Sequence, residues 1–418
     1  MSTSLSPEVF DVDDIRPVSD PPRQSCGSVD KSGRLPALDA LRGLAAVMVV
    51  FHHFYLTLPS PWLGIAHGWL DWPGLRPIII GRPAVILFFV LSGFVLTRSL
   101  QREAELSLVK FVMRRCLRIY PPFLAAIALS GLLFALIAPV RPSTLSAWFN
   151  AQWIGAPDAA VLARHAFSQA VGRDTTLDHP IWSLVHEFRF SLVLPFIFMA
   201  VGRWGLRNVV LSGGVASIAG FFAATQDAID PSQHYGGFLF VGGTPVGSIA
   251  LTIYFSIYFI TGMAVAMHFE ACRRALAAVP AWLFACACVA SLMLLSEWNE
   301  LAAASGAVGA ILIAAVWSSA HRSLAMRPLQ WLGRISYSLY LVHLPVLLAV
   351  GHVLSGRAPI LVIFVFAFVA ALGLAQLLCA WVERPAILLA GRLPAALLPR
   401  RVKTRLPEVF HDATMGRN

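Results

Sequence analysis

Long apolar segments separated by short polar ones fill most of the chain between residues 35 and 388. Ten of these segments reach about 20 residues, the length at which an α-helix crosses a hydrocarbon core of ~30 Å. The pattern therefore predicts an all-α polytopic membrane protein with about ten transmembrane helices. The predicted helices are 38–58, 78–98, 116–138, 181–201, 208–225, 247–268, 279–296, 301–319, 335–354 and 359–382.

Polar segments flank this transmembrane domain, which we predict to extend over residues 35–388. Residues 1–34 are rich in Ser, Pro and Asp, so we expect a disordered cytoplasmic tail without a cleavable signal peptide. The basic residues 389–418 predict a second cytoplasmic tail. Cations also concentrate in the turns after the second, fourth, sixth and eighth predicted helices. The positive-inside rule places those turns, and therefore both termini, in the cytoplasm.

The composition excludes several classes of protein. Of 418 residues, 57% are hydrophobic and only 13% are charged, which is far outside the range of soluble domains. We attribute the net charge of +10 to cations that set the membrane topology and that interact with anionic lipid. We therefore expect no nucleic-acid partner. The six cysteines occur singly or as Cys286 and Cys288 in an apolar run, so we expect buried thiols and no metal site.

The first predicted helix carries polar side chains where they are costly. A charge near the middle of a span costs roughly 2.5 to 3.5 kcal/mol, so Arg42 and His53 indicate function. Eleven residues separate them, which places both on nearly one helix face, about 16 Å apart along the axis. With this helix running outward, Arg42 lies near the cytoplasmic boundary and His53 near the middle of the membrane.

Two further cations open the third predicted helix. Arg115 and Arg118 are one turn apart on one face. They either bind phosphate groups from the cytoplasmic side or serve as positive-inside anchors whose side chains reach the lipid headgroups.

The fourth predicted helix runs inward, with Asp178 as an expected cap. Glu187 then lies about 10 Å below the outer boundary, close to the depth of His53. We expect a buried pair in which the carboxylate orients the imidazole, or else a structural pair with Arg189 or another cation. Ser183 has no Gly-x-Ser-x-Gly elbow around it, which disfavours a serine hydrolase.

The ninth predicted helix again runs outward and contains Tyr340 and, one turn further, His343. His343 is either part of a site or a hydrogen-bonded packing residue. Tryptophans in the outer loops either form an interfacial belt or stack on sugar rings. They are Trp62, Trp69, Trp72, Trp148 and Trp153.

Six motifs in this order resemble the acyltransferase 3 family of integral membrane O-acyltransferases, from about Leu35 to Pro385. They are Leu38-Asp39-x-Leu41-Arg42-Gly43 with ten residues between Arg42 and His53, Phe88-Phe89-Val-Leu-Ser92-Gly93-Phe94, Arg115-x-x-Arg118-Ile-x-Pro121, Trp182-Ser183-Leu184-x-x-Glu187, Ser336-Tyr337-x-x-Tyr340-x-x-His343 and Glu383-Arg384-Pro385.

The resemblance implies transfer of an acyl group, commonly acetyl from acetyl-CoA, to a sugar hydroxyl of an envelope or secreted glycan or a lipid-linked sugar. It implies that His53 is the catalytic histidine and that Arg42 is its companion. It also implies that Arg115 and Arg118 bind the donor and that Glu187 is the acidic residue of the site. Trp182, Ser183, Tyr340 and His343 are then candidates for substrate binding. The chain departs from the commoner pattern at Val185, His186 and Phe188, which leaves the acceptor open.

These implications predict a multi-pass enzyme of the bacterial inner membrane that uses acyl-CoA and no metal. The acyl group passes either directly to the acceptor or through an acyl-histidine. The alternative is a proton-coupled transporter or flippase of a glycan precursor, although the chain shows no internal repeat of the kind that transporters often have.

Overall fold

The computed structural model describes residues 35–72, 74–102, 107–137, 144–153, 157–167, 177–227, 234–235, 238–239 and 244–392. Most of these residues are helical. The strands among them are two short antiparallel segments, β1 (His234–Tyr235) and β2 (Phe238–Leu239). The prediction of an all-α polytopic membrane protein is confirmed.

Within the described residues, eight helices are long and apolar enough to cross a membrane. They are α1 (Pro36–Thr57), α3 (Arg82–Arg102), α4 (Leu108–Ile137), α7 (Ile181–Trp204), α8 (Leu206–Asp227), α9 (Pro245–Met267), α14 (Arg327–Leu354), and α15 (Ile360–Leu378) continued by a π-helical turn (Cys379–Glu383) and α16 (Arg384–Gly391). The other two predicted spans correspond to α11 (Ala281–Leu295) and α12 (Glu300–Val316). With 15 and 17 residues, these two measure only about 22 to 26 Å. The cytoplasmic position of both termini stays a prediction.

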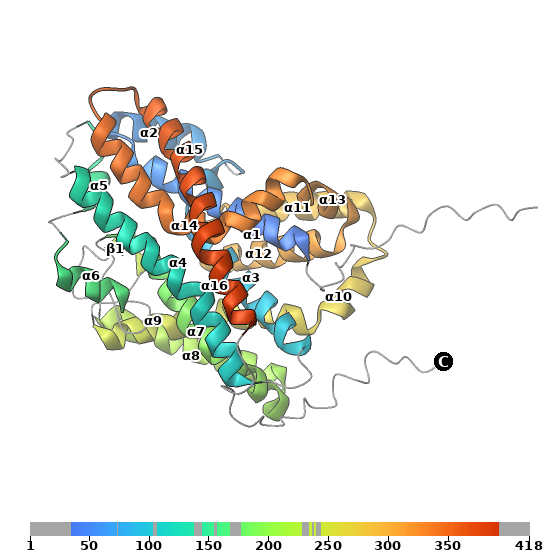
Figure 1. The fold of residues 1–418 in the computed structure, drawn as a ribbon. Helices are drawn as coiled ribbons and strands as arrows, with labels where there is room; N and C mark the ends of the chain where they lie inside the picture. The colour runs from blue at the N-terminus through green and yellow to red at the C-terminus, as the bar shows by residue number, and fades with distance from the viewer. Residues whose placement is uncertain are drawn as a thin grey trace, which may run out of the picture.

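Shorter helices connect the long ones. They are α2 (Ser60–Leu70), the 3₁₀ turn η1 (Arg76–Ile78), α5 (Ala147–Asn150), α6 (Ala159–Ala166), α10 (Phe269–Leu276) and α13 (Ser318–Leu324). Figure 1 shows α2 and α5 near one end of the molecule, at the upper left, and α10 at the right. In sequence, α2, α5 and α6 all belong to the loops predicted to face outward.

Helix α4 begins at Leu108, eight residues before the predicted start of the third span at residue 116. The three cations of this first part lower its hydropathy but do not oppose helix formation, because Lys and Arg have high helix propensity. As a result, Arg115 and Arg118 lie well inside a continuous helix of 30 residues.

Glycines bring pairs of helices into backbone contact at two places. A Cβ on Gly43 of α1 would lie 2.7 Å from the backbone nitrogen of Gly333 in α14. Gly93 of α3 and Gly262 of α9 meet the backbones of Phe259 and Val90 in the same way. Small residues at such crossings let transmembrane helices pack closely, which fixes the register of α1 against α14 and of α3 against α9.

An ion pair inside the helical body joins α3 to α12. The Arg82 guanidinium lies 2.6 Å from Glu300, and both side chains are almost fully buried. The hydroxyls of Tyr254 and Tyr258 on α9 donate to the other carboxylate oxygen of Glu300 at 2.6 and 2.5 Å. The charges are thus paired and hydrogen-bonded, as a low-dielectric environment requires.

Candidate active site

His53 and His343 lie side by side in the core. Each histidine is ten residues beyond the glycine at which α1 and α14 touch, so both helices carry an imidazole to the same level. Nε2 of His343 lies 3.2 Å from Nδ1 of His53, and the ring centroids are 5.0 Å apart. Both side chains are buried.

The backbone around the pair fixes which nitrogens carry hydrogen. Nδ1 of His343 lies 2.8 Å from the carbonyl oxygen of Tyr340, and Nδ1 of His53 lies 2.8 Å from that of Val49. A carbonyl oxygen only accepts, so we assign hydrogen to both Nδ1 atoms. Nε2 of neutral His343 then accepts from His53, and Nε2 of His53 keeps its lone pair. This is the arrangement of an oriented general base.

Trp148, which the sequence assigned to an interfacial belt or to stacking on sugar rings, packs against this base. The Trp148 ring lies 5.5 Å from that of His53, and Trp148 is buried. It belongs to α5, which is attached to the end of α1 because Ser146 bonds to the carbonyls of Leu56 and Thr57. Trp153 is also buried. Trp62, Trp69 and Trp72, in contrast, are each more than half exposed, as an interfacial belt requires.

The predicted pairing of Glu187 with His53 is wrong. Glu187 accepts a hydrogen bond of 2.9 Å from Ser92, whereas the partners of His53 are Val49 and His343. The alternative pair with Arg189 does not form, because that guanidinium points to α9. The other alternative, another cation, agrees with the electrostatic interaction between Glu187 and Arg115. A similar depth along two helices does not ensure a hydrogen bond, which also depends on how each helix is rotated.

Glu187 belongs to a charged cluster. Arg115 interacts electrostatically with Arg118, Glu187 and Arg42, and Arg118 interacts in addition with Glu383. The fold therefore brings the four predicted charged residues Arg42, Arg115, Arg118 and Glu187 together from α1, α4 and α7. Glu383 is held by the Ser338 hydroxyl at 2.7 Å, which assigns the Glu-Arg-Pro motif a role in this cluster.

A small cavity of about 20 Å³ adjoins this cluster. By volume it has room for about one water. Arg42 and Glu187 of the cluster line it together with aromatic and hydroxyl side chains: Phe88, Phe89, Ser183, Leu184, Ser336, Tyr337 and Tyr340. The ring of Tyr340 lies 5.8 Å from that of His343, so one lining residue also contacts the histidine pair.

Ser183 and Tyr340, both in the lining of this cavity, are joined by a hydrogen bond. The Ser183 hydroxyl lies 2.6 Å from the Tyr340 hydroxyl, which donates to the carbonyl of Pro180 at 3.0 Å. Trp182 turns the other way, with the Arg82 guanidinium 5.1 Å from its ring. The structure thus places Ser183 and Tyr340 in the site and gives Trp182 a packing contact with the buried ion pair.

The expected cap of α7 by Asp178 is wrong. The helix begins after Pro180 without a side-chain cap, because the carboxylate precedes the first turn by too many residues to reach its amides. Asp178 is buried instead, and burial raises the pKa of its carboxyl well above the usual range. Burial lowers the pKa of the neighbouring His179 to about 4, and the charge of His52 acts in the same direction by disfavouring a second positive charge.

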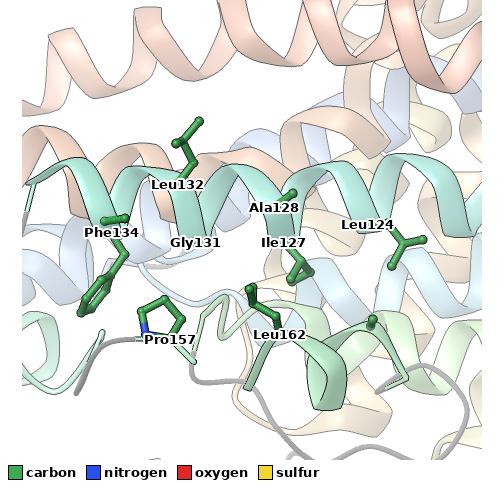
Figure 2. A pocket seen from close by; sticks show the side chains of 10 residues that line it. Leu124, Ile127, Ala128, Gly131, Leu132, Phe134, Pro157 and Leu162 are labelled. Atoms are coloured by element: carbon green, nitrogen blue, oxygen red, sulfur yellow. The ribbon is translucent and has the colours of Figure 1, made fainter. Parts of the chain in front are cut away.

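In the described part of the chain, neither an apolar groove nor a metal site adds reactive groups to those already named. A groove of about 670 Å³ between α4 and α6 is lined by apolar side chains such as Leu124, Ile127 and Leu162 (Figure 2). Among the described residues, no three His, Cys, Asp or Glu side chains form a group that could hold a metal ion. The cations suited to phosphate are those of the charged cluster.

The helices and the buried polar site define a polytopic membrane protein of the acyltransferase class. The sequence profile described as "Acyltransferase domain" (Acyl_transf_3) matches residues 35–380. The chain therefore belongs to the acyltransferase 3 family. No solved structure matches it.

Several curated proteins are similar to this chain. YrhL of Bacillus subtilis (strain 168), whose name assigns it provisionally to the peptidoglycan O-acetyltransferases, is 25% identical over 84% of this chain and 54% of its own length. The peptidoglycan O-acetyltransferase OatA of Listeria monocytogenes serovar 1/2a is 22% identical over 78% of this chain and 51% of its own. The acyltransferase MdmB of Streptomyces mycarofaciens is 31% identical over 42% of each. The chain thus spans about half the length of the curated relatives it matches.

Proposed function

We propose that this protein is an O-acyltransferase of the bacterial inner membrane that moves an acyl group, in the simplest case acetyl, from acyl-CoA to a sugar hydroxyl of an envelope glycan. The observation that carries the proposal is His53 with a free Nε2, oriented by His343 and covered by Trp148. Relatives named for peptidoglycan O-acetylation support a glycan of that type as acceptor. None of the relatives' names supports the transporter alternative.

Donor binding is assigned to the charged cluster. Guanidiniums bind phosphate oxygens in pairs, and Arg42, Arg115 and Arg118 act on one another electrostatically, so an anionic ligand would relieve their repulsion. We place the phosphates of CoA there, on the cytoplasmic side, with the thioester directed toward His53.

The chemistry then follows from the tautomer of His53. Nε2 takes the proton of the acceptor hydroxyl as its oxygen attacks the thioester carbonyl, and the C–S bond breaks to release the CoA thiolate. The imidazolium returns the proton to that thiolate, so no proton is gained or lost. A positioned base of this kind contributes roughly 10² to 10⁴-fold to the rate. His343 stabilises the imidazolium by accepting its Nδ1 hydrogen.

The reaction is tested with purified protein in nanodiscs, acetyl-CoA and a solubilised envelope glycan fraction. The proposal expects CoA release that requires both substrates, and release that never depends on the glycan would contradict it. Intact mass after incubation with acetyl-CoA alone distinguishes the two routes. A protein heavier by one acetyl group indicates an acyl-histidine, and an unchanged mass indicates direct transfer.

A further inference from the structure

Asp178 is a buried carboxyl group without a hydrogen-bond partner in the described part of the chain. The residue is 1% exposed, and neither carboxylate oxygen has a hydrogen-bond donor among the described residues. Asp178 is not a helix cap, and it forms no ion pair with another described residue. Burying a polar group without a hydrogen bond costs several kcal/mol in an apolar environment, so such a group calls for an explanation.

The backbone next to this carboxylate is held firmly. The carbonyl of Leu177 accepts from the Ser130 hydroxyl at 2.6 Å and from the Trp153 indole at 3.1 Å. The amide of Leu177 donates to Nε2 of His165 at 3.1 Å. Three buried hydrogen bonds from α4, α6 and the segment after α5 thus fix the chain that presents Asp178. A carboxylate fixed in this way without a partner has the character of a preorganised binding group.

Its position relates it to the candidate active site. Asp178 precedes by two residues the Pro180 carbonyl that accepts from Tyr340, and its charge acts on Tyr340. The adjacent His179 acts electrostatically on His53. Asp178 and His179 therefore belong to a segment within electrostatic range of Tyr340 and His53.

We infer that Asp178 binds a hydroxyl group of the sugar acceptor and thereby positions the reacting hydroxyl at His53. A carboxyl group offers an acceptor oxygen in either protonation state, and sugar hydroxyls donate hydrogen bonds. Burial without an ion pair disfavours negative charge at this point, so the part of the acceptor bound here is neutral and rich in hydroxyls. This inference rests on the proposed function.

The test compares Asp178→Asn with the wild type in nanodiscs. The amide keeps the shape but replaces one carboxyl oxygen by an NH₂ group, which only donates, so we expect the acceptor KM to rise at least tenfold while the KM for acetyl-CoA is unchanged. Thermal stability should stay equal or increase, because the buried group is then neutral at every pH. Asp158→Asn is the matched control, since this exposed carboxylate caps α6 and Asn caps equally well.

Binding of solubilised peptidoglycan fragments without acetyl-CoA separates this inference from the proposed function. We expect Asp178→Asn to bind them at least tenfold more weakly than wild type, and His53→Ala to bind them nearly as well. Fragments that bind without any turnover would contradict the proposed function alone. The inference would be overturned if Asp178→Asn had the same acceptor KM and the same fragment affinity as the wild type. Loss of the folded state in Asp178→Asn, or no binding of fragments by the wild type, would also overturn it.

Discussion

At the scale of single residues, the site is defined by which atoms can accept and donate hydrogen. Two backbone carbonyls, of Val49 and Tyr340, set the tautomers of His53 and His343 and leave one lone pair on Nε2 of His53. Backbone carbonyls cannot change their role, so this assignment does not depend on a titrating neighbour. The orientation of the base is therefore built into α1 and α14 themselves.

Replacing His343 tests this orientation. In His343→Ala, the imidazolium of His53 loses the nitrogen that accepts its Nδ1 hydrogen, so we expect kcat to fall about 10- to 100-fold with little change in either KM. Initial rates of CoA release measure this effect. His268→Ala, at the exposed junction of α9 and α10, is the matched control and should be unchanged. A wild-type kcat in His343→Ala would remove His343 from its positioning role.

Replacing Trp148 tests whether its indole protects the base from water. Without the indole over His53, water reaches the base and competes with the acceptor hydroxyl. We expect Trp148→Ala to increase CoA release in the absence of glycan by several-fold relative to transfer. Acetylated glycan and free CoA are measured in the same reaction. Trp69→Ala, with an exposed side chain on α2, provides the comparison. An unchanged ratio of hydrolysis to transfer would contradict the assigned role.

At the scale of elements, close crossings of helices hold the reacting groups. A Cβ at position 333 would overlap the carbonyl of Asp39 on α1, so Gly333→Ala must separate α1 from α14. We expect a loss of about 1 to 3 kcal/mol in stability together with reduced activity, because His53 and His343 move apart. Gly373→Ala on α15 faces open space and should change neither. Thermal unfolding and CoA release measure both effects. Equal behaviour of the two variants would contradict this role of the crossing.

The buried ion pair between α3 and α12 makes a separate prediction about stability. Glu300→Gln breaks the buried ion pair with Arg82 by removing one of its charges, which typically costs 3 to 5 kcal/mol, so we expect a clearly lower unfolding temperature. Glu297→Gln removes a carboxylate that is about half exposed, 3.9 Å from Arg76, and should cost about 1 kcal/mol or less. The two unfolding temperatures are compared in the same detergent. A similar small shift in both would show that the pair adds little.

Across the elements, the sequence predicted the helices better than their contacts. Apolar runs located the eight long helices and the shorter helices α11 and α12 of the described chain. The start of α4 was missed because its cations lower hydropathy without breaking the helix. His53 and His343 were both candidates, yet their pairing depends on the crossing of Gly43 with Gly333, which no local pattern reveals. For the same reason Glu187 was assigned to the wrong partner. Trp148 was a candidate for the interfacial belt or for sugar stacking, but its contact with His53 follows from α5 folding back on α1 and was not predicted.

At the scale of the whole molecule, the site has two sides with different chemistry. Cations from α1 and α4 gather in the charged cluster, whereas the histidine pair lies within electrostatic range of the segment that carries Asp178 and His179. This polarity matches a reaction that receives an anionic donor from one face of the membrane and a neutral, hydroxyl-rich acceptor from the other. The family match over residues 35–380 covers all of these groups.

The central claim is that His53 is the base for acyl transfer to a glycan hydroxyl. The most direct measurement is the amount of O-acetylated glycan formed from acetyl-CoA by His53→Ala and by His268→Ala, at equal folded protein in nanodiscs. We predict that His268→Ala forms the product at the wild-type rate and that His53→Ala forms at least 100-fold less, in line with the loss of a positioned base. Equal product from the two variants would contradict the account.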